Sequence, residues 1–323
     1  MMWLEEFRVD GLRYDSTLYM RTIDMVQEIP EACELFRGLN GEIRGRFPGK
    51  ILIAEDLQDS HALTAPVEEG GAGFHSQWCA HFVHPVRAAV TTPEDDHRSM
   101  GQVAGALLQR FNNDVFQRVV YSESHDEVAN GKQRVTSEVN AEEPQDWYAR
   151  RRSTLAGALA LTAPGIPMLF QGQEFLEDGW FEDTVPLDWE LSEDFRGIVR
   201  LYRDLIRLRR NLDGVSAGLT GQGIQMIRND EDKNVLAFSR YAEPEQEVLV
   251  IAHFSAQEME TFRLGLPGPG IWKIRLNTAA STYSPDYDEP KGGQVEAEEI
   301  PWDEQQHSAE FKLAPYSLMN LSR

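Results

Sequence analysis

Short apolar runs alternate with longer helical stretches from the first residues to about residue 212. Each apolar run is short enough for one strand. The candidate strands are Phe7–Tyr14, Ile51–Glu55, Phe74–Trp78, Val119–Ser122 and Ile166–Phe170. Strands that alternate with helices in this way predict an α/β fold with parallel strands, because each helix returns the chain to the start of the next strand.

Helical periodicity fills the intervals between these runs. The expected helices are Ala32–Phe47, Met100–Phe111, Trp147–Thr162 and Phe195–Leu212. The first follows Pro30, and the third stops at Pro164-Gly165, which are start and stop signals for helices. The last has apolar residues at helical spacing, with arginines on the opposite face.

The pattern changes near Gly214, beyond which no good helix is expected. Turn signals such as Pro267–Gly270 separate short strand runs at Val235–Tyr241, Val248–Phe254, Phe262–Leu266, Trp272–Leu276 and Phe311–Leu321. This spacing predicts an antiparallel β-sandwich, with the acidic stretch from Asp286 to Gln306 as a solvated loop. We therefore expect two domains, residues 1–213 and residues 214–323.

Composition narrows the classes of partner. The 323 residues are 41% hydrophobic and 26% charged, as in a soluble globular protein, and their net charge of −22 argues against nucleic acid. No stretch approaches the ~20 consecutive apolar residues that a membrane span needs. Two cysteines, Cys33 and Cys79, provide neither a disulfide framework nor a metal cluster. We expect no cofactor and no metal, and a cytoplasmic location, since the charged start lacks the apolar core of a signal peptide.

Three candidate strands end in carboxylates. The run FRVDGLRYD ends at Asp15, KILIAED ends at Glu55 and Asp56, and RVVYSESHDE reaches Asp126 and Glu127. In a barrel of parallel strands the active site forms at the C-terminal strand ends, so these side chains are expected to converge. For any one of them alone, a helix cap or a solvated loop residue is an equally good interpretation.

Glycoside cleavage needs such a set of carboxylates. One attacks the anomeric carbon or stabilises its positive charge, and another, kept protonated, gives its proton to the leaving oxygen. Arg13 lies two residues before Asp15, on the same face of the strand, where it is able to orient that carboxylate. His75, His81 and His84 lack a matching ligand pattern, so we expect no metal site there.

At these residues the sequence resembles the α-amylase family of glycoside hydrolases and transglycosylases, which carries short motifs at barrel strands four, five, seven and eight. DGLRYD resembles the fourth-strand motif, IAED the fifth, SHDE the seventh and PMLFQGQEF the eighth. The resemblance implies that Asp15 is the nucleophile, Glu55 the general acid/base and Asp126 the transition-state stabiliser. It also implies that Arg13 and His125 bind substrate or orient the site.

Within the family, the branching-enzyme group is the most similar. The resemblance rests on the stretches SHDEVANGK (Ser124–Lys132), PVEEGGAGF (Pro66–Phe74) and LFQGQEF. The C-terminal segments Val248–Tyr283 and Leu313–Ser322 also resemble that group. The resemblance implies a 1,4-α-glucan branching enzyme of glycogen biosynthesis, acting on α-1,4-glucan as donor and acceptor. Two alternatives stay open: an α-glucan hydrolase, such as an α-amylase or a maltooligosyl-trehalose trehalohydrolase, and a non-catalytic glucan-binding fragment.

The chain begins at the motif of the fourth strand. We therefore expect the C-terminal part of a (β/α)8 TIM barrel, strands four to eight, followed by the β-sandwich. A closed barrel of this type needs eight strands, so we expect the chain to be a fragment, from either a truncated or a split gene. In the split-gene alternative a separate N-terminal half complements it.

Overall fold

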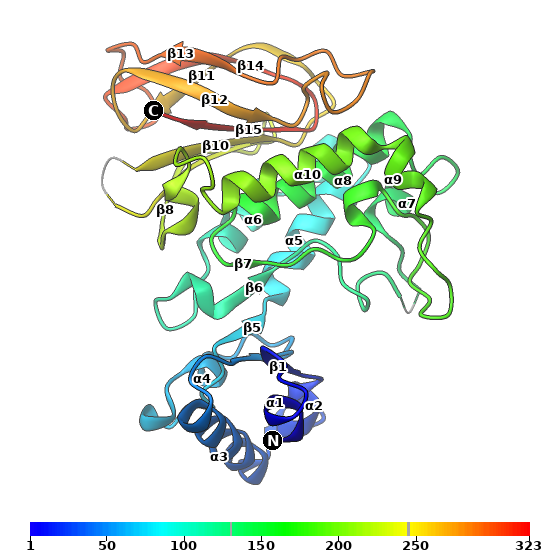
Figure 1. Ribbon diagram of the computed structural model, residues 1–323. Coiled ribbons are helices and arrows are strands. Elements are labelled where there is room, and N and C mark those ends of the chain that lie inside the picture. Colours follow the sequence, from blue (N-terminus) through cyan, green and yellow to red (C-terminus); the bar gives the residue numbers. More distant parts are fainter. Residues whose placement is uncertain (130, 244–245) are drawn as a thin grey trace. The chain divides into compact units, whose positions relative to one another are not determined.

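The computed structural model describes residues 1–129, 131–243 and 246–323 as two compact units. The first unit comprises residues 1–81 and 109–120, and the second comprises residues 82–108 and 121–323. Each unit is described by itself (Figure 1). Within the described residues, no helix is both long enough and apolar enough to cross a bilayer.

The first unit is built on a parallel sheet of short strands. Its elements are α1 (Met2–Glu5), β1 (Gly11–Tyr14), α2 (Thr17–Arg21), β2 (Thr22–Ile23), β3 (Gln27–Glu28), α3 (Pro30–Arg46), β4 (Ile51–Ala54), α4 (His61–Thr64), η1 (Val67–Glu69), β5 (Ser76–Trp78), η3 (Val115–Gln117) and β6 (Arg118–Val120). The strands β1, β4, β5 and β6 lie side by side in that order, and every pair is parallel. This confirms the predicted parallel α/β arrangement.

Helix α3 covers this sheet. It begins with Pro30 at its first turn, where a proline costs no hydrogen bond. Its apolar face places Phe36 and Ile43 in a core with Leu52 and Phe74. The strand predicted from Phe7 begins only at Gly11, because Phe7 is exposed and lies outside the core.

The second unit joins helices to a β domain. Its elements are α5 (Ala80–Thr91, whose first two residues belong to the first unit), η2 (Asp95–His97), α6 (Met100–Leu108), α7 (Val135–Val139), α8 (Trp147–Thr162), β7 (Ile166–Pro167), η4 (Gln173–Phe175), α9 (Glu190–Asp194), α10 (Arg196–Arg209), η5 (Ala217–Thr220), β8 (Gly223–Asp230), β9 (Val235–Tyr241), β10 (Glu247–His253), β11 (Met259–Leu266), β12 (Ile271–Asn277), β13 (Gly293–Glu296), β14 (His307–Leu313) and β15 (Ser317–Ser322). Helix α8 has the predicted bounds, and α10 is shorter than predicted at both ends.

The β domain consists of two antiparallel sheets around one core. A six-stranded sheet has the order β13-β12-β15-β10-β9-β8, and β11 pairs with β14 in a second sheet. Inward-facing residues of both sheets share a core, including Leu249, Phe262, Trp272 and Phe311. This arrangement is the predicted sandwich.

Three details of the β domain differ from prediction. The run Phe311–Leu321 is two strands, β14 and β15, because the chain turns at Pro315 and Tyr316, where Tyr316 has φ 45°. The stretch from Asp286 to Gln306, predicted to be a loop, contains β13, which pairs with β12. Strand β8 was also not predicted, since its sequence GIQMIRND has little apolar alternation.

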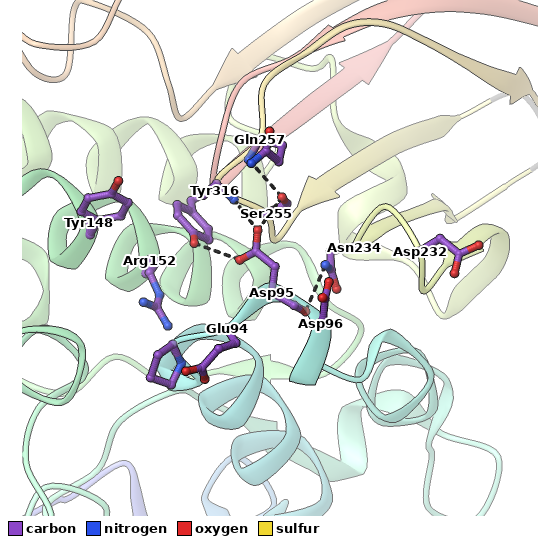
Figure 2. A pocket seen from close by; sticks show the side chains of 12 residues that line it. Glu94, Asp95, Asp96, Tyr148, Arg152, Asp232, Asn234, Ser255, Gln257 and Tyr316 are labelled. Atoms are coloured by element: carbon purple, nitrogen blue, oxygen red, sulfur yellow. Dashed lines mark hydrogen bonds between the residues drawn. The ribbon is translucent and has the colours of Figure 1, made fainter.

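Asp95 links the helical part of the second unit to the β domain (Figure 2). Its carboxylate accepts hydrogen bonds from Ser255 Oγ (2.6 Å), Ala256 N (2.9 Å) and Tyr316 Oη (3.1 Å). Burial alone raises the pKa of Asp95, but these bonds and the charge of Arg98 outweigh it and lower the pKa. The pocket around Asp95, about 510 Å³, contains none of the predicted catalytic residues.

Candidate active site

Asp15 and Glu55 follow two adjacent parallel strands of the first unit. Tyr14, the last residue of β1, lies opposite Ala54, the last residue of β4, so the two carboxylates emerge at the same sheet edge. Glu55 N donates to Tyr14 O at 3.0 Å and extends the ladder by one residue. Neighbouring strands lie about 4.8 Å apart. The register therefore places the backbones of Asp15 and Glu55 side by side at this edge of the sheet.

Arg13 contacts both of these carboxylates. Its Nη1 donates to Asp15 Oδ1 at 2.9 Å, and its Nη2 lies 2.5 Å from Glu55 Oε2. The guanidinium carbon lies 4.3 Å from the ring centre of Trp78, on the next strand, β5. Because Trp78 is buried, it serves here as a packing surface for the guanidinium. The Asp15 side chain is 74% exposed and that of Glu55 only 7%, so Asp15 is the accessible member of the pair.

Residues of the turn after β1 donate hydrogen bonds to both the side chain and the backbone carbonyl of Glu55. Ser16 adopts a left-handed conformation (φ 46°), and its N–H donates to Glu55 Oε2 at 2.8 Å. Thr17 donates to the Glu55 carbonyl from both its amide nitrogen (2.9 Å) and its hydroxyl (2.7 Å). Sequence reasoning missed Ser16 and Thr17, because only the register of β1 and β4 brings them to Glu55.

Asp56, next to Glu55, has a different partner. Its carboxylate, fully buried, accepts from Arg21 Nε at 2.6 Å and from Arg21 Nη2 at 2.9 Å. The hydrogen bond with Asp56 is the main cause of a raised Arg21 pKa. Asp56 therefore fixes helix α2 to the end of β4 and is not available to substrate.

His125 and Asp126 form a pair in the second unit. Nε2 of His125 lies 3.3 Å from Asp126 Oδ2, and both side chains are partly exposed, at 40% and 46%. The His125 ring packs edge-on against Phe181, whose amide donates to Val128 O at 2.7 Å. Of the motif Ser124–Lys132, Asn130 lies outside the described residues.

Glu123 and Glu127 lie near this pair in the sequence, but both are buried. Lys132 Nζ lies 3.0 Å from the Glu127 carboxylate. Glu123 is buried, accepts from Val135 N at 2.7 Å and lies 3.6 Å from Arg134. Burial raises the pKa of Glu123 and lowers that of Arg134, although their mutual attraction opposes both shifts. Sequence reasoning did not identify this buried pair, because its members are eleven residues apart and share no motif.

The eighth-strand motif contributes a structural hydrogen bond. Gln173 is buried, and its Nε2 donates to Ser122 Oγ at 2.7 Å. Phe170 lies under the Arg134 guanidinium, 4.8 Å from ring centre to Cζ. These contacts fix the segment after β6 against the segment after β7.

The three neighbouring histidines have separate partners. His75 Nδ1 accepts from Leu52 N at 3.0 Å, and His81 contacts the Asp59 carboxylate. His84 Nδ1 lies 3.8 Å from Glu127. His75 and His81 lie in the first unit and His84 in the second. The structure thus brings Arg13, Asp15 and Glu55 together in one unit and pairs His125 with Asp126 in the other, while the convergence of all three carboxylates stays a prediction.

The amino-acid sequence is similar to a known family model and to named enzymes. Residues 227–323 match the family model for the C-terminal all-β domain of α-amylases. A 1,4-alpha-glucan branching enzyme GlgB of Myxococcus xanthus is 30% identical over 339 residues, covering 99% of this chain and 45% of the relative. That of Nocardia farcinica is 32% identical over 343 residues, covering 99% and 44%. The C-terminal β domain belongs to the α-amylase family.

Two solved structures have a fold similar to that of this chain. A pullulanase complexed with maltotetraose, from Anoxybacillus sp. LM18-11, matches 99% of this chain and 44% of its own, with a TM-score of 0.63 and 18% identity. An Anoxybacillus α-amylase matches 99% of this chain and 60% of its own, also with a TM-score of 0.63, at 16% identity. The chain spans less than half the length of the curated relatives that it matches.

Proposed function

We propose that this chain carries the catalytic carboxylates of a retaining 1,4-α-glucan branching enzyme. The observation that carries the proposal is the cluster of Asp15 and Glu55 at the ends of adjacent parallel strands, bridged by Arg13. Two relatives that match 99% of the chain are named as branching enzymes, which favours this member of the family. In this proposal residues 1–213 supply strands four to eight of a (β/α)8 barrel, and residues 214–323 form the β domain.

The reaction proceeds by two displacements. An oxygen of Asp15 attacks the anomeric carbon of an α-1,4-linked glucose, the bond from that carbon to O4 breaks, and Glu55 gives its proton to O4. Glu55 then takes a proton from the 6-hydroxyl of an acceptor glucan. That oxygen attacks the anomeric carbon and displaces Asp15, so that an α-1,6 linkage forms and both carboxyl groups return to their starting states.

The remaining predicted residues assist this chemistry. We assign Asp126 to stabilisation of the positively charged transition state and His125 to binding of the same sugar. Arg13 orients Asp15 and Glu55. A complementing N-terminal segment would supply barrel strands one to three. The substrate is an α-1,4-glucan in the cytoplasm, as both donor and acceptor.

The linkages of the products test the proposal. We would incubate amylose with the chain by itself and with the chain fused to the preceding barrel strands of the Myxococcus xanthus relative. New α-1,6 anomeric signals in the proton NMR spectrum, without a matching rise in reducing ends, are expected from at least one form. A rise in reducing ends without α-1,6 signals would instead establish a hydrolase. Saturable amylose binding by both forms, without either product, would establish the glucan-binding alternative.

Covalent trapping tests the role of Asp15 separately. A retaining enzyme forms a glycosyl ester with its nucleophile, which a fluorinated glucosyl donor accumulates. Peptide mass spectrometry should locate the added sugar on Asp15, and Asp15→Asn should abolish labelling. Labelling of another carboxylate would overturn the assignment. In retaining enzymes the two carboxyl groups lie ~5–5.5 Å apart. A crystal structure of the enzyme with the Asp15 and Glu55 carboxyl groups far outside that distance would also overturn the assignment.

A further inference from the structure

A basic pocket lies at the start of helix α10 in the second unit. Its volume is about 990 Å³, and Arg150, Arg196, Arg200 and Arg203 line it. The same wall includes the segment from Ser281 to Pro285, which follows β12. This size lies at the upper end of the range for small-molecule sites, which is about 300–1,000 Å³.

The pocket is unusual for a chain whose net charge is −22. Four arginines line it, against two carboxylates, Glu193 and Asp194. Arg196, Arg200 and Arg203 are exposed, and within the described ranges no carboxylate lies at ion-pair distance from any of them. In a chain with 53 acidic residues and 31 basic ones, three adjacent arginines without an acidic partner leave a local surplus of positive charge.

The nearest carboxylates already have other partners. Asp204, one helical turn after Arg200, accepts from Tyr283 Oη at 2.7 Å and lies 2.6 Å from Lys291 Nζ. Asp286 contacts Arg150. Arg150 is therefore neutralised within the protein, whereas its three neighbours on α10 keep their full charge for a ligand.

The position of Arg196 also opposes helix stability. The first turn of α10 contains Arg196 and no acidic residue. The amino end of a helix carries a partial positive charge, so arginine there costs stability that an acidic residue would have added. An anion bound in the pocket would offset this cost.

We propose that this pocket binds a small ligand through a phosphoryl group. Arginine guanidinium groups fit phosphate oxygens with paired hydrogen bonds, and the hydroxyls of Ser281 and Thr282 are further donors on the wall. Phe195 and Ile198 give the pocket an apolar portion beside the arginines. A concave site of this size selects a phosphorylated sugar or a nucleotide over an extended polyanion, which the acidic remainder of the chain would repel.

Calorimetric titration of the full chain tests this inference without any assay of glucan chemistry. The probes are inorganic phosphate, glucose 6-phosphate and adenosine monophosphate, each at low ionic strength. We expect saturable binding of at least one probe, weakened by added salt. The double variant Arg200→Gln/Arg203→Gln should weaken that binding about tenfold or more, as expected for the loss of charge-assisted hydrogen bonds.

Arg210→Gln is the matched control. Arg210 follows the last residue of α10, at the end opposite the pocket, is exposed and does not line the pocket. Its substitution removes one positive charge from the end of the same helix and should leave affinity within about twofold, because an exposed charge outside the site acts only through a screened field. Thermal melts verify the fold of each variant, and Arg196→Gln replaces the double variant if the latter unfolds. Absence of saturable binding for all three probes, or equal weakening by Arg210→Gln, would overturn the proposal. The three probes separate free phosphate, sugar phosphate and nucleotide as the source of the phosphoryl group.

Discussion

The guanidinium of Arg13 lies 2.5 Å from the carboxylate of Glu55, which ends the strand beside its own. The same guanidinium donates to Asp15 at 2.9 Å. One planar group thus spans two carboxylates from two strands, and the ring of Trp78 supports it from the third strand. A rigid fork of donors is suited to this task in a way that a single ammonium group is not.

Substitution of Arg13 should therefore impair catalysis more than folding. We expect Arg13→Gln to lower kcat for branching of amylose by about 10²-fold, because misplaced catalytic groups cost rates of that order. Arg13→Lys should recover only part of the loss, since lysine keeps the charge without the fork. The measurement is steady-state kinetics on the active form of the enzyme, with a thermal melt of each variant.

Arg46→Gln is a control for Arg13. Arg46 lies in the same unit and contacts Glu5 and Glu42 at the surface. Exposed ion pairs contribute little, about 0–1 kcal/mol, so kcat should not change. If Arg13→Gln and Arg46→Gln had the same kcat, the bridging role of Arg13 would be wrong.

The buried pair of Arg21 and Asp56 leads to a prediction about stability. Both side chains are at least 95% buried, and the contact is bidentate. Asp56→Leu leaves the Arg21 charge buried without its partner and should lower the free energy of unfolding by about 3–5 kcal/mol. The double variant Arg21→Met/Asp56→Leu should recover much of that loss, because no buried charge is left. Urea unfolding of the full set of variants measures the coupling, and simple additivity of the two single changes would contradict it.

The sequence predicted the elements whose signals are local. Helix α8 has the predicted bounds because Asp146 caps its start and Pro164-Gly165 follows its end. Strand β9 also matches, since it opens with an apolar run from Val235 to Phe238. Strands β8 and β13 were not predicted, because pairing with a neighbour stabilises them and their own sequence does not.

Some residues of the candidate site were likewise predictable from local sequence, and others were not. Arg13, Asp15 and Glu55 could be named from strand ends and motif resemblance. The supporting contacts could not, because the Ser16 amide reaches Glu55 only through a left-handed residue and a particular strand register. Likewise, the basic pocket combines α10 with a segment about 80 residues later, and periodicity within the helix gave no sign of that partner.

Alanine should have opposite effects on stability at two helical glycines, one packed between α8 and α10 and the other in open space on α6. A Cβ added at Gly157 would overlap the buried hydroxyl of Tyr202, whereas a Cβ at Gly105 on α6 would meet no atom within 4 Å. We expect Gly157→Ala to cost about 1–3 kcal/mol of stability through overpacking. Gly105→Ala should add about 0.5–1 kcal/mol, because alanine is the better helix former. Urea unfolding measures both, and a stabilising Gly157→Ala would contradict the packing of Tyr202 on α8.

Burial of His253 predicts a dependence of stability on pH. Its side chain lies in β10, 1% exposed, and Nδ1 lies 2.9 Å from Ala314 O, so Nδ1 carries the proton because a carbonyl only accepts. Burial lowers the pKa of His253 in the folded chain, although the Ala314 carbonyl and the nearby Asp95 oppose that shift. In the unfolded chain the pKa returns to about 6.5. As pH falls through that value, the unfolded state therefore takes up a proton that the folded state does not, and stability falls.

His253→Gln should remove this contribution. Between pH 7.5 and pH 5.5 we expect the free energy of unfolding to fall less steeply in His253→Gln than in the unmodified chain. The difference in slope is at most about 1.4 kcal/mol per pH unit, the value for one proton. His97→Gln is the control, since the His97 side chain is 72% exposed and faces solvent. Urea unfolding at several pH values measures each slope, and comparing slopes removes any constant loss from the substitution itself. If His253→Gln kept the full slope while His97→Gln flattened it, the proton uptake would belong to the exposed histidine and not to the one buried in β10.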